Sequence, residues 1–229
     1  RECQFTDPAC LRILVSKLLG WALVAGACGL KLPQIFNIFV SKSTKGVNFS
    51  MYYLELIVYT ITVSYSIHQV PRFPFSTYGD SAAILVQDLV LILMLHVYGK
   101  QLNLNFFVLV ALYTAFAAVT LGGFAPTATL ALLQSLTIPL GIVSRVPQIL
   151  QNLREKSTGQ LSFITFFLNT GGAAARIFTT LTELNDNILL LAYCVSTTLN
   201  GIITLQIVYY SYMAGSAKAK APARRKKIN

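Results

Sequence analysis

The sequence predicts an all-α membrane protein with seven transmembrane helices, arranged as two parallel three-helix bundles joined by a linker helix (3+1+3). Composition is the first observation behind this fold class. Of the 229 residues, 55% are hydrophobic and only 11% are charged, with a mean hydropathy of +0.62. Soluble domains carry about a quarter charged residues. An internal repeat is the second observation: KLPQIFNIFVSKSTKGVNF at 31–49 returns as RVPQILQNLREKSTGQLSF at 145–163.

The helices are expected where apolar runs approach the length of about 20 residues that crosses a bilayer as a helix. Backbone groups in lipid must find their hydrogen-bond partners within the protein, and the runs lack the alternation of a β-barrel, so helices are predicted. Short polar or Gly/Pro-containing stretches separate the runs. The seven predicted segments are roughly 18–40, 51–67, 81–98, 104–121, 127–151, 162–182 and 187–212.

The repeat sets the predicted domain organisation. Its two copies are offset by 114 positions, so helices one to three correspond to helices five to seven, and the lone fourth helix restores the direction of the second copy. Parallel repeats of this kind occur in transporters, which bind substrate near the midplane between the halves. The predicted parts are a luminal N-terminal segment (1–17), a first bundle (18–98), a linker helix (99–122), a second bundle (123–212) and a cytosolic basic tail (213–229).

The distribution of basic residues predicts the orientation. Six of the 18 Lys and Arg residues lie in the last twelve positions, so most of the net charge of +10 belongs to the tail. A basic tail beside a membrane span is typical of a topology signal, which argues against a nucleic-acid partner. The C-terminus is therefore expected in the cytosol and the N-terminus in a lumen, where Cys3 and Cys10 either form a disulfide or remain free. The cysteines show no metal-binding spacing, so no metal and no cofactor are expected.

Each copy of the repeat places a proline and a glutamine inside an apolar run. Pro33 and Pro147 remove a backbone donor and push against the carbonyl four residues earlier, which predicts a kink in each helix. Gln34 and Gln148 have donors and acceptors to offer the freed groups. Matched kinks favour two hinges beside a gate or hydrated cavity. The alternative is that each pair is a packing feature without function.

Ionisable residues inside the predicted spans are the main candidates for a substrate site. Such groups are costly in lipid and are usually paired or functional. Two readings stay open: internal salt bridges that hold helices together, or basic residues left free for an anionic ligand. Arginine and lysine both suit phosphate. The residues concerned are Lys31, Glu55, Asp88, Arg145 and Arg176.

Polar uncharged residues complete the candidate substrate-binding set. Gln87 and Asn200 lie at similar depths in the third and seventh helices, and Asn169 lies in the sixth. Interhelical hydrogen bonds are the alternative role for such residues. The sequence offers no nucleophile motif, phosphate loop or paired acid and base, so no catalytic residues are predicted and the chain is not expected to be an enzyme.

The two PQ motifs in a 3+1+3 layout resemble the PQ-loop superfamily, whose members include the SWEET sugar exporters and lysosomal exporters of cystine and cationic amino acids. Within it, the similarity is greatest to the mannose-P-dolichol utilization defect family and spans residues 18–212. The similarity is carried by KLPQI at 31–35, LEL at 54–56, YSI at 65–67, FPFS at 73–76, STGQLSFITFFLNTGGAAARIFT at 157–179 and LNGIITLQIVYY at 199–210.

This resemblance implies a multi-pass endoplasmic-reticulum protein needed for the use of dolichyl-phosphate mannose and dolichyl-phosphate glucose in glycan and GPI-anchor assembly. It implies dolichyl-phosphate sugars, membrane lipid and luminal glycosyltransferases as partners. Three mechanisms stay open: translocation or presentation of the lipid-linked sugar, assistance to glycosyltransferases without transport, and SWEET-like carriage of a small solute. The final residues KKIN resemble a dilysine retrieval signal formed by Lys226 and Lys227.

Overall fold

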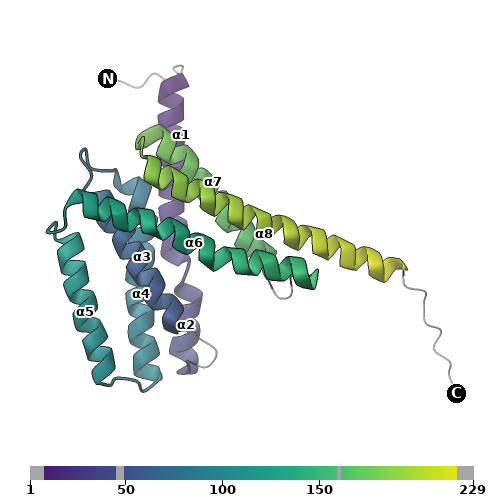
Figure 1. Cartoon of the computed structure of the whole chain (residues 1–229), viewed down its shortest axis with the longest axis horizontal. Helices are drawn as coiled ribbons and strands as arrows, with labels where there is room; N and C mark the ends of the chain where they lie inside the picture. The colour runs from purple at the N-terminus through teal and green to yellow at the C-terminus, as the bar shows by residue number, and fades with distance from the viewer. Residues whose placement is uncertain (1–7, 45–48, 159–160, 221–229) are drawn as a thin grey trace. The chain divides into compact units, whose positions relative to one another are not determined.

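The computed structural model describes residues 8–44, 49–158 and 161–220, and these residues fold entirely into helices and their connections. The first predicted segment is split into α1 and α2, so seven helical segments contain eight helices (Figure 1). The predicted all-helical fold is confirmed, with three segments, the linker α5 and three further segments in chain order. The helices are α1 (Pro8–Gly29), α2 (Leu32–Ser41), α3 (Phe49–Ile67), α4 (Phe75–Tyr98), α5 (Leu104–Leu121), α6 (Thr127–Glu155), α7 (Phe163–Glu183) and α8 (Asn187–Lys220).

Three helix boundaries differ from the predicted ones by more than a turn. Helix α1 begins at Pro8 rather than near residue 18, so part of the predicted N-terminal segment is helical. Proline is favoured in the first turn of a helix, because its missing N–H would have no partner there. Helix α4 begins directly after Pro74, and α8 continues to Lys220. Hydropathy marks where lipid contact ends, whereas a helix continues through polar residues until its backbone is interrupted.

Length and hydropathy identify five candidate membrane spans among the described residues, namely Pro8–Ser41, Phe75–Tyr98, Leu104–Leu121, Thr127–Glu155 and Asn187–Tyr212. Helices α3 and α7, also predicted as spans, are rich in polar residues and are not among these five. The polar residues of α3 face the protein: Thr60 and Ser64 are fully buried. The hydroxyls of Thr60 and Ser66 donate to carbonyls of the preceding turn, each at 2.7 Å, whereas the Ser64 hydroxyl has no partner among the described residues.

The chain packs as two compact units, and each is described by itself. Unit 1 contains the described residues up to Ile138 together with Ala175–Ala192, and unit 2 contains Pro139–Ala174 and the described residues from Tyr193 onward. In unit 1, α4 packs against both α1 and α3, and α3 packs against α5 (Figure 1). Helix α4 also packs against α2, and its Leu91 and Leu95 are completely buried, so it lies at the centre of unit 1.

Helices α1 and α4 approach most closely at Gly20. A Cβ atom at this position would lie 2.7 Å from the carbonyl oxygen of Ser76. That carbonyl also accepts a hydrogen bond of 2.9 Å from Arg176 Nη1. A glycine is therefore required here, since a larger residue would push α4 away from α1.

Unit 2 is built from parts of α6, α7 and α8. Its apolar core consists of Phe166 from α7 and Ile203 and Ile207 from α8, with Ile149 of α6 and Leu161 packed against it. Phe166 brings α7 into this core, and Thr170 of α7 also contacts Thr204 of α8, with 3.3 Å between the two hydroxyl oxygens. This core positions the second copy of the repeat.

The repeat is visible in the backbone as well as in the sequence. Helix α2 ends before Lys42 and α6 ends before Lys156, residues that the 114-position offset aligns. Both lysines adopt the left-handed conformation, with φ of 48° and 49°. Such a residue ends a helix by turning the chain away from the helix axis. The two copies therefore end their first helices in the same way.

Candidate functional site

The first repeat contains a break between α1 and α2 that a side chain bridges. Gln87 of α4 accepts a hydrogen bond from the Lys31 N–H at 2.9 Å and donates one to the Ala27 carbonyl at 2.8 Å. Pro33 lies in the first turn of α2, where its missing N–H leaves no hydrogen bond unmade. The predicted kink is thus a complete break, and Gln87 supplies the partners that its backbone lacks.

Lys31 lies at this break and is paired inside unit 1. Its ammonium group forms ion pairs with Glu55 of α3, at 2.5 Å, and with Asp88 of α4. It also lies over the ring of Tyr52, 5.0 Å from the centroid, and Tyr52 in turn contacts Gln34. Only 8% of Lys31 is exposed, and Asp88 is completely buried. Two roles were open for Lys31, Glu55 and Asp88: an internal salt bridge, or a site in which the base is free for an anionic ligand. The observed contacts are those of an internal salt bridge.

Arg145 aligns with Lys31 but has different surroundings. Its guanidinium lies over the ring of Phe166, 5.8 Å from the centroid, and Phe166 aligns with Tyr52. The cation–π contact is therefore common to both repeats. The ion pairs are not: the residue aligned with Glu55 is Asn169, the residue aligned with Asp88 is Ile202, and Arg145 forms no ion pair within the described residues.

Unit 2 offers little to balance the charge of Arg145. Glu155 is the single acidic residue in Pro139–Ala174 and from Tyr193 to the C-terminus, and it lies ten positions further along α6. A charge at the centre of a membrane helix costs about 2.5–3.5 kcal/mol on insertion scales. A cation–π contact recovers about 0.5–2 kcal/mol. A half-buried Arg145 therefore remains attractive to an anion.

A chain of amide side chains connects α6 to α8 in unit 2. Gln148 donates to Asn152 at 2.9 Å, Asn152 donates to Gln206 at 2.8 Å, and Gln206 donates to the Ile149 carbonyl at 3.1 Å. Gln148 thus bonds forward along its helix, and α6 runs through Pro147 without a break. This network fastens α6 to α8 just beyond the proline.

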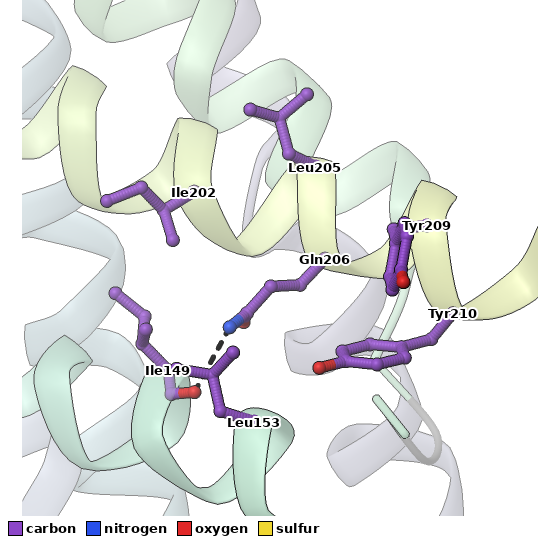
Figure 2. A pocket seen from close by; sticks show the side chains of 7 residues that line it. All are labelled: Ile149, Leu153, Ile202, Leu205, Gln206, Tyr209 and Tyr210. Atoms are coloured by element: carbon purple, nitrogen blue, oxygen red, sulfur yellow. Dashed lines mark hydrogen bonds between the residues drawn. The ribbon is translucent and has the colours of Figure 1, made fainter. Parts of the chain in front are cut away.

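An open groove follows α6 and α8 next to this network (Figure 2). Its volume is about 340 Å³, and its walls are apolar apart from one amide and two phenol groups. Arg145 precedes the groove residue Ile149 by one helical turn on the same face of α6. The lining residues are Ile149, Leu153, Ile202, Leu205, Gln206, Tyr209 and Tyr210.

Arg176 is the third intramembrane base, and a carboxylate neutralises it. It pairs with Asp80 of α4 at 2.7 Å and, at 3% exposure, is buried. Asp80 lies just before the predicted third segment (81–98) but inside the observed α4, so it was not among the predicted partners. The remaining polar candidates are apart from these groups: Asn169 is exposed, and Asn200 donates to the Ser196 carbonyl of its own helix at 2.8 Å.

Sequence reasoning missed the two aromatic residues that contact the aligned bases and two members of the amide chain that begins at Gln148. Tyr52 and Phe166 could have been found, because the offset of 114 aligns two aromatic residues with each other. Asn152 and Gln206 gave no such signal, since the first repeat has isoleucine at both aligned positions. Cys10 forms a disulfide, whereas Cys3, Lys226 and Lys227 lie outside the described residues.

Comparisons with known proteins agree with the repeat and the fold. The PQ loop repeat family matches residues 15–75 and 129–189. The chain is 23% identical over 201 residues to human solute carrier family 66 member 3, an alignment that covers 88% of this chain and 96% of the relative. A solved structure of a eukaryotic SWEET transporter superposes with a TM-score of 0.70 at 14% identity, covering 88% of this chain and 98% of that one.

The two matched stretches start 114 positions apart, which is the offset of the repeat found in the sequence. Together they cover more than half of the chain, and along the described residues three helical segments precede the linker helix α5 and three follow it. This chain is a multi-pass membrane protein that belongs to the PQ loop repeat family, is similar in sequence to human solute carrier family 66 member 3, and shares its fold with a eukaryotic SWEET transporter.

Proposed function

We propose that this protein binds dolichyl-phosphate mannose and dolichyl-phosphate glucose in the endoplasmic-reticulum membrane and moves them across the bilayer for glycan and GPI-anchor assembly. Such lipids combine a long isoprenoid chain with a phosphodiester charge and a polar sugar. The charge and the sugar are costly to transfer through hydrocarbon without a polar path. A protein that carries them must offer polar groups beside an opening for the chain.

The observation that carries this proposal is the groove along α6 and α8. Leu205, at 70% exposure, and Leu153, at 52%, lie on its walls, so the groove exposes apolar side chains along two candidate membrane spans. Its volume of about 340 Å³ falls in the range of about 300–1,000 Å³ that is usual for ligand sites. An apolar groove open to lipid suits an isoprenoid chain, whereas a free sugar would need polar walls.

Reconstitution tests this function. The full chain is inserted into vesicles that contain a fluorescent, short-chain dolichyl-phosphate mannose in both leaflets, and a membrane-impermeant quencher reports the lipid in the outer leaflet. The expected result is accelerated exchange between leaflets, in proportion to the number of vesicles that contain protein. The same vesicles loaded with free mannose measure carriage of a soluble sugar.

The outcomes separate the mechanisms. Exchange of the lipid without release of mannose supports the proposal. Binding of the lipid without exchange would replace transport by presentation to glycosyltransferases. Mannose release without lipid exchange would favour a SWEET-like solute carrier, the mechanism that the fold alone suggests.

The proposed location depends on two features of the chain ends. The disulfide of Cys10 is consistent with an oxidising lumen at the N-terminal side. The KKIN terminus would then be cytosolic, where a dilysine signal is read. Lys226→Ser together with Lys227→Ser is expected to shift the tagged protein from the endoplasmic reticulum to later secretory compartments, as seen by fluorescence microscopy. An unchanged distribution would contradict the signal.

A further inference from the structure

We propose that Arg145, rather than Lys31, supplies the positive charge that binds the phosphate of a polyprenyl phosphodiester at the groove of unit 2. This assignment deepens the proposed function and rests on it. Of the two aligned bases, Lys31 then stabilises the packing of unit 1 and Arg145 binds the ligand. The reasons are charge, free hydrogen-bond donors and position.

The first reason is that Lys31 and Arg145 differ in the ion pairs that they form. Lys31 contacts two carboxylates, so an anionic ligand would have to compete with groups already in place. Arg145 contacts none within the described residues. Unit 2 contains only Glu155 as an acidic residue, and its carboxylate accepts a hydrogen bond from Gln151 at 2.9 Å. A phosphate would supply the complementary charge that no described carboxylate provides to Arg145.

The donor argument concerns the guanidinium of Arg145. An arginine has five N–H donors in a planar fork that matches two phosphate oxygens. Phe166 contacts the guanidinium at 5.8 Å, and none of the five donors has a hydrogen-bond acceptor in the described part of the chain. An aromatic platform of this kind can orient the guanidinium while its N–H groups remain available.

The position argument joins Arg145 to the groove. Phe166 packs in the apolar core of unit 2, and Ile149 packs against that core and also lines the groove. Arg145 lies one helical turn before Ile149. A lipid with its chain along Ile202 and Leu205 can therefore bring its phosphate toward Arg145. We assign the groove to an isoprenoid phosphate lipid, because the apolar groove begins one helical turn beyond Arg145, a cation with no ion pair among the described residues.

Direct binding to the purified full chain in detergent tests this assignment. The probe is a fluorescent short-chain polyprenyl phosphate, compared with the matching polyprenol, with free mannose 1-phosphate and with phosphatidic acid. Arg145→Gln is expected to weaken binding of the polyprenyl phosphate by about 10- to 100-fold and to leave binding of the polyprenol unchanged. Arg145→Lys is expected to recover part of the loss, because lysine keeps the charge without the fork.

Arg154→Gln is the matched control, since Arg154 is an exposed arginine near the end of the same helix. It is expected to bind like the wild type. A second variant neutralises the first repeat through Lys31→Gln, Glu55→Gln and Asp88→Asn, and size-exclusion chromatography checks that it is folded. It is expected to keep the preference for phosphate over alcohol. Loss of that preference here, with Arg145 intact, would transfer the assignment to Lys31.

Three results would overturn the inference: wild-type affinity in Arg145→Gln, an equal loss in Arg154→Gln, or equal affinity for phosphatidic acid, which would remove the isoprenoid specificity. Failure of the proposed function looks different. If binding depends on Arg145 but no transbilayer movement follows, transport is rejected and the assignment stands. If Arg145→Gln moves the lipid as fast as the wild type, the assignment is rejected and transport stands.

Discussion

The two repeats have a basic residue at the same position, but the groups around that residue differ. Lys31 and Arg145 both lie over an aromatic ring, which belongs to α3 in the first repeat and to α7 in the second. Lys31 also has two carboxylates and a bridging glutamine around it, whereas Arg145 has an apolar groove nearby. A duplicated motif thus keeps its backbone and its cation–π contact while its charge partners diverge. Similar sequence at the motif therefore does not give the two bases the same contacts.

The same divergence appears where the helices of each repeat pack together. In the second repeat, Asn152 and Gln206 are hydrogen-bonded across α6 and α8. The aligned residues of the first repeat are Ile38 and Ile92, and both belong to one buried apolar cluster. The contact between α2 and α4 in the first repeat is apolar, whereas the contact between α6 and α8 in the second repeat contains hydrogen-bonded amide side chains. A hydrogen-bonded contact can be exchanged for water or ligand groups more readily than an apolar one, which fits a ligand site in the second half.

The largest expected difference between the repeats concerns stability. Lys31→Met leaves two carboxylates without their cation, and breaking a buried ion pair costs about 3–5 kcal/mol. Arg145→Met removes a cation without a carboxylate and should change the free energy of unfolding by less than about 1 kcal/mol. Chemical unfolding of the purified protein in detergent measures both. Addition of Glu55→Gln and Asp88→Asn should recover much of the Lys31→Met loss. Equal effects at the two positions would contradict the comparison.

A smaller effect is expected at the helix break of the first repeat. Gln87→Leu leaves the buried Lys31 N–H without its partner, at about 1–3 kcal/mol, while the Ala27 carbonyl keeps its hydrogen bond from the Leu30 N–H. Hydrogen exchange of the α1 and α2 amides should increase around the break. Gln151→Leu is the control, because its side chain bonds only to exposed Glu155. Protection that is unchanged in Gln87→Leu would show that the break does not depend on this side chain.

A third comparison moves the packing of the first repeat into the second. Asn152→Ile or Gln206→Ile alone leaves an amide unpaired and should cost about 1–2 kcal/mol of unfolding free energy. The double variant recreates the Ile38 and Ile92 pair and should cost less than the sum of the two, since both partners become apolar. A double-mutant cycle from unfolding curves measures the coupling. Additive losses would mean that the two side chains do not act as a pair.

The smallest effect is expected at Gly201, which aligns with Gln87. A Cβ atom there would lie 3.7 Å from Thr170 Cγ2, an ordinary van der Waals contact. Gly201→Ala should therefore stabilise α8 by about 0.5–1 kcal/mol, because alanine loses less backbone entropy in a helix. A rise in the thermal unfolding midpoint checks this. A matched test is Gly20→Ala, which should lower the midpoint because its Cβ would meet the Ser76 carbonyl at 2.7 Å.

The sequence by itself determined the helical segments, their number and the repeat. These features depend on local composition and on an offset that can be read along one chain, and both were confirmed. It also singled out Lys31, Arg145 and Arg176 as bases within predicted spans, and their role in substrate binding stays a prediction. The start of α1 at Pro8 and the break at Lys31 were not found, because hydropathy does not register where a backbone bond is missing.

Only the tertiary structure decided which charges are balanced. Lys31 takes both Glu55 and Asp88, which lie 24 and 57 positions away, while Arg176 finds Asp80 at a separation of 96. Arg145 pairs with no carboxylate in the part of the chain that the structure describes. Hydropathy and periodicity say that a charge lies in a helix, but they say nothing about how neighbouring helices are rotated. Ion pairs form over about 4 Å, so the rotation of packed helices, rather than the spacing of residues in the chain, selects the partners.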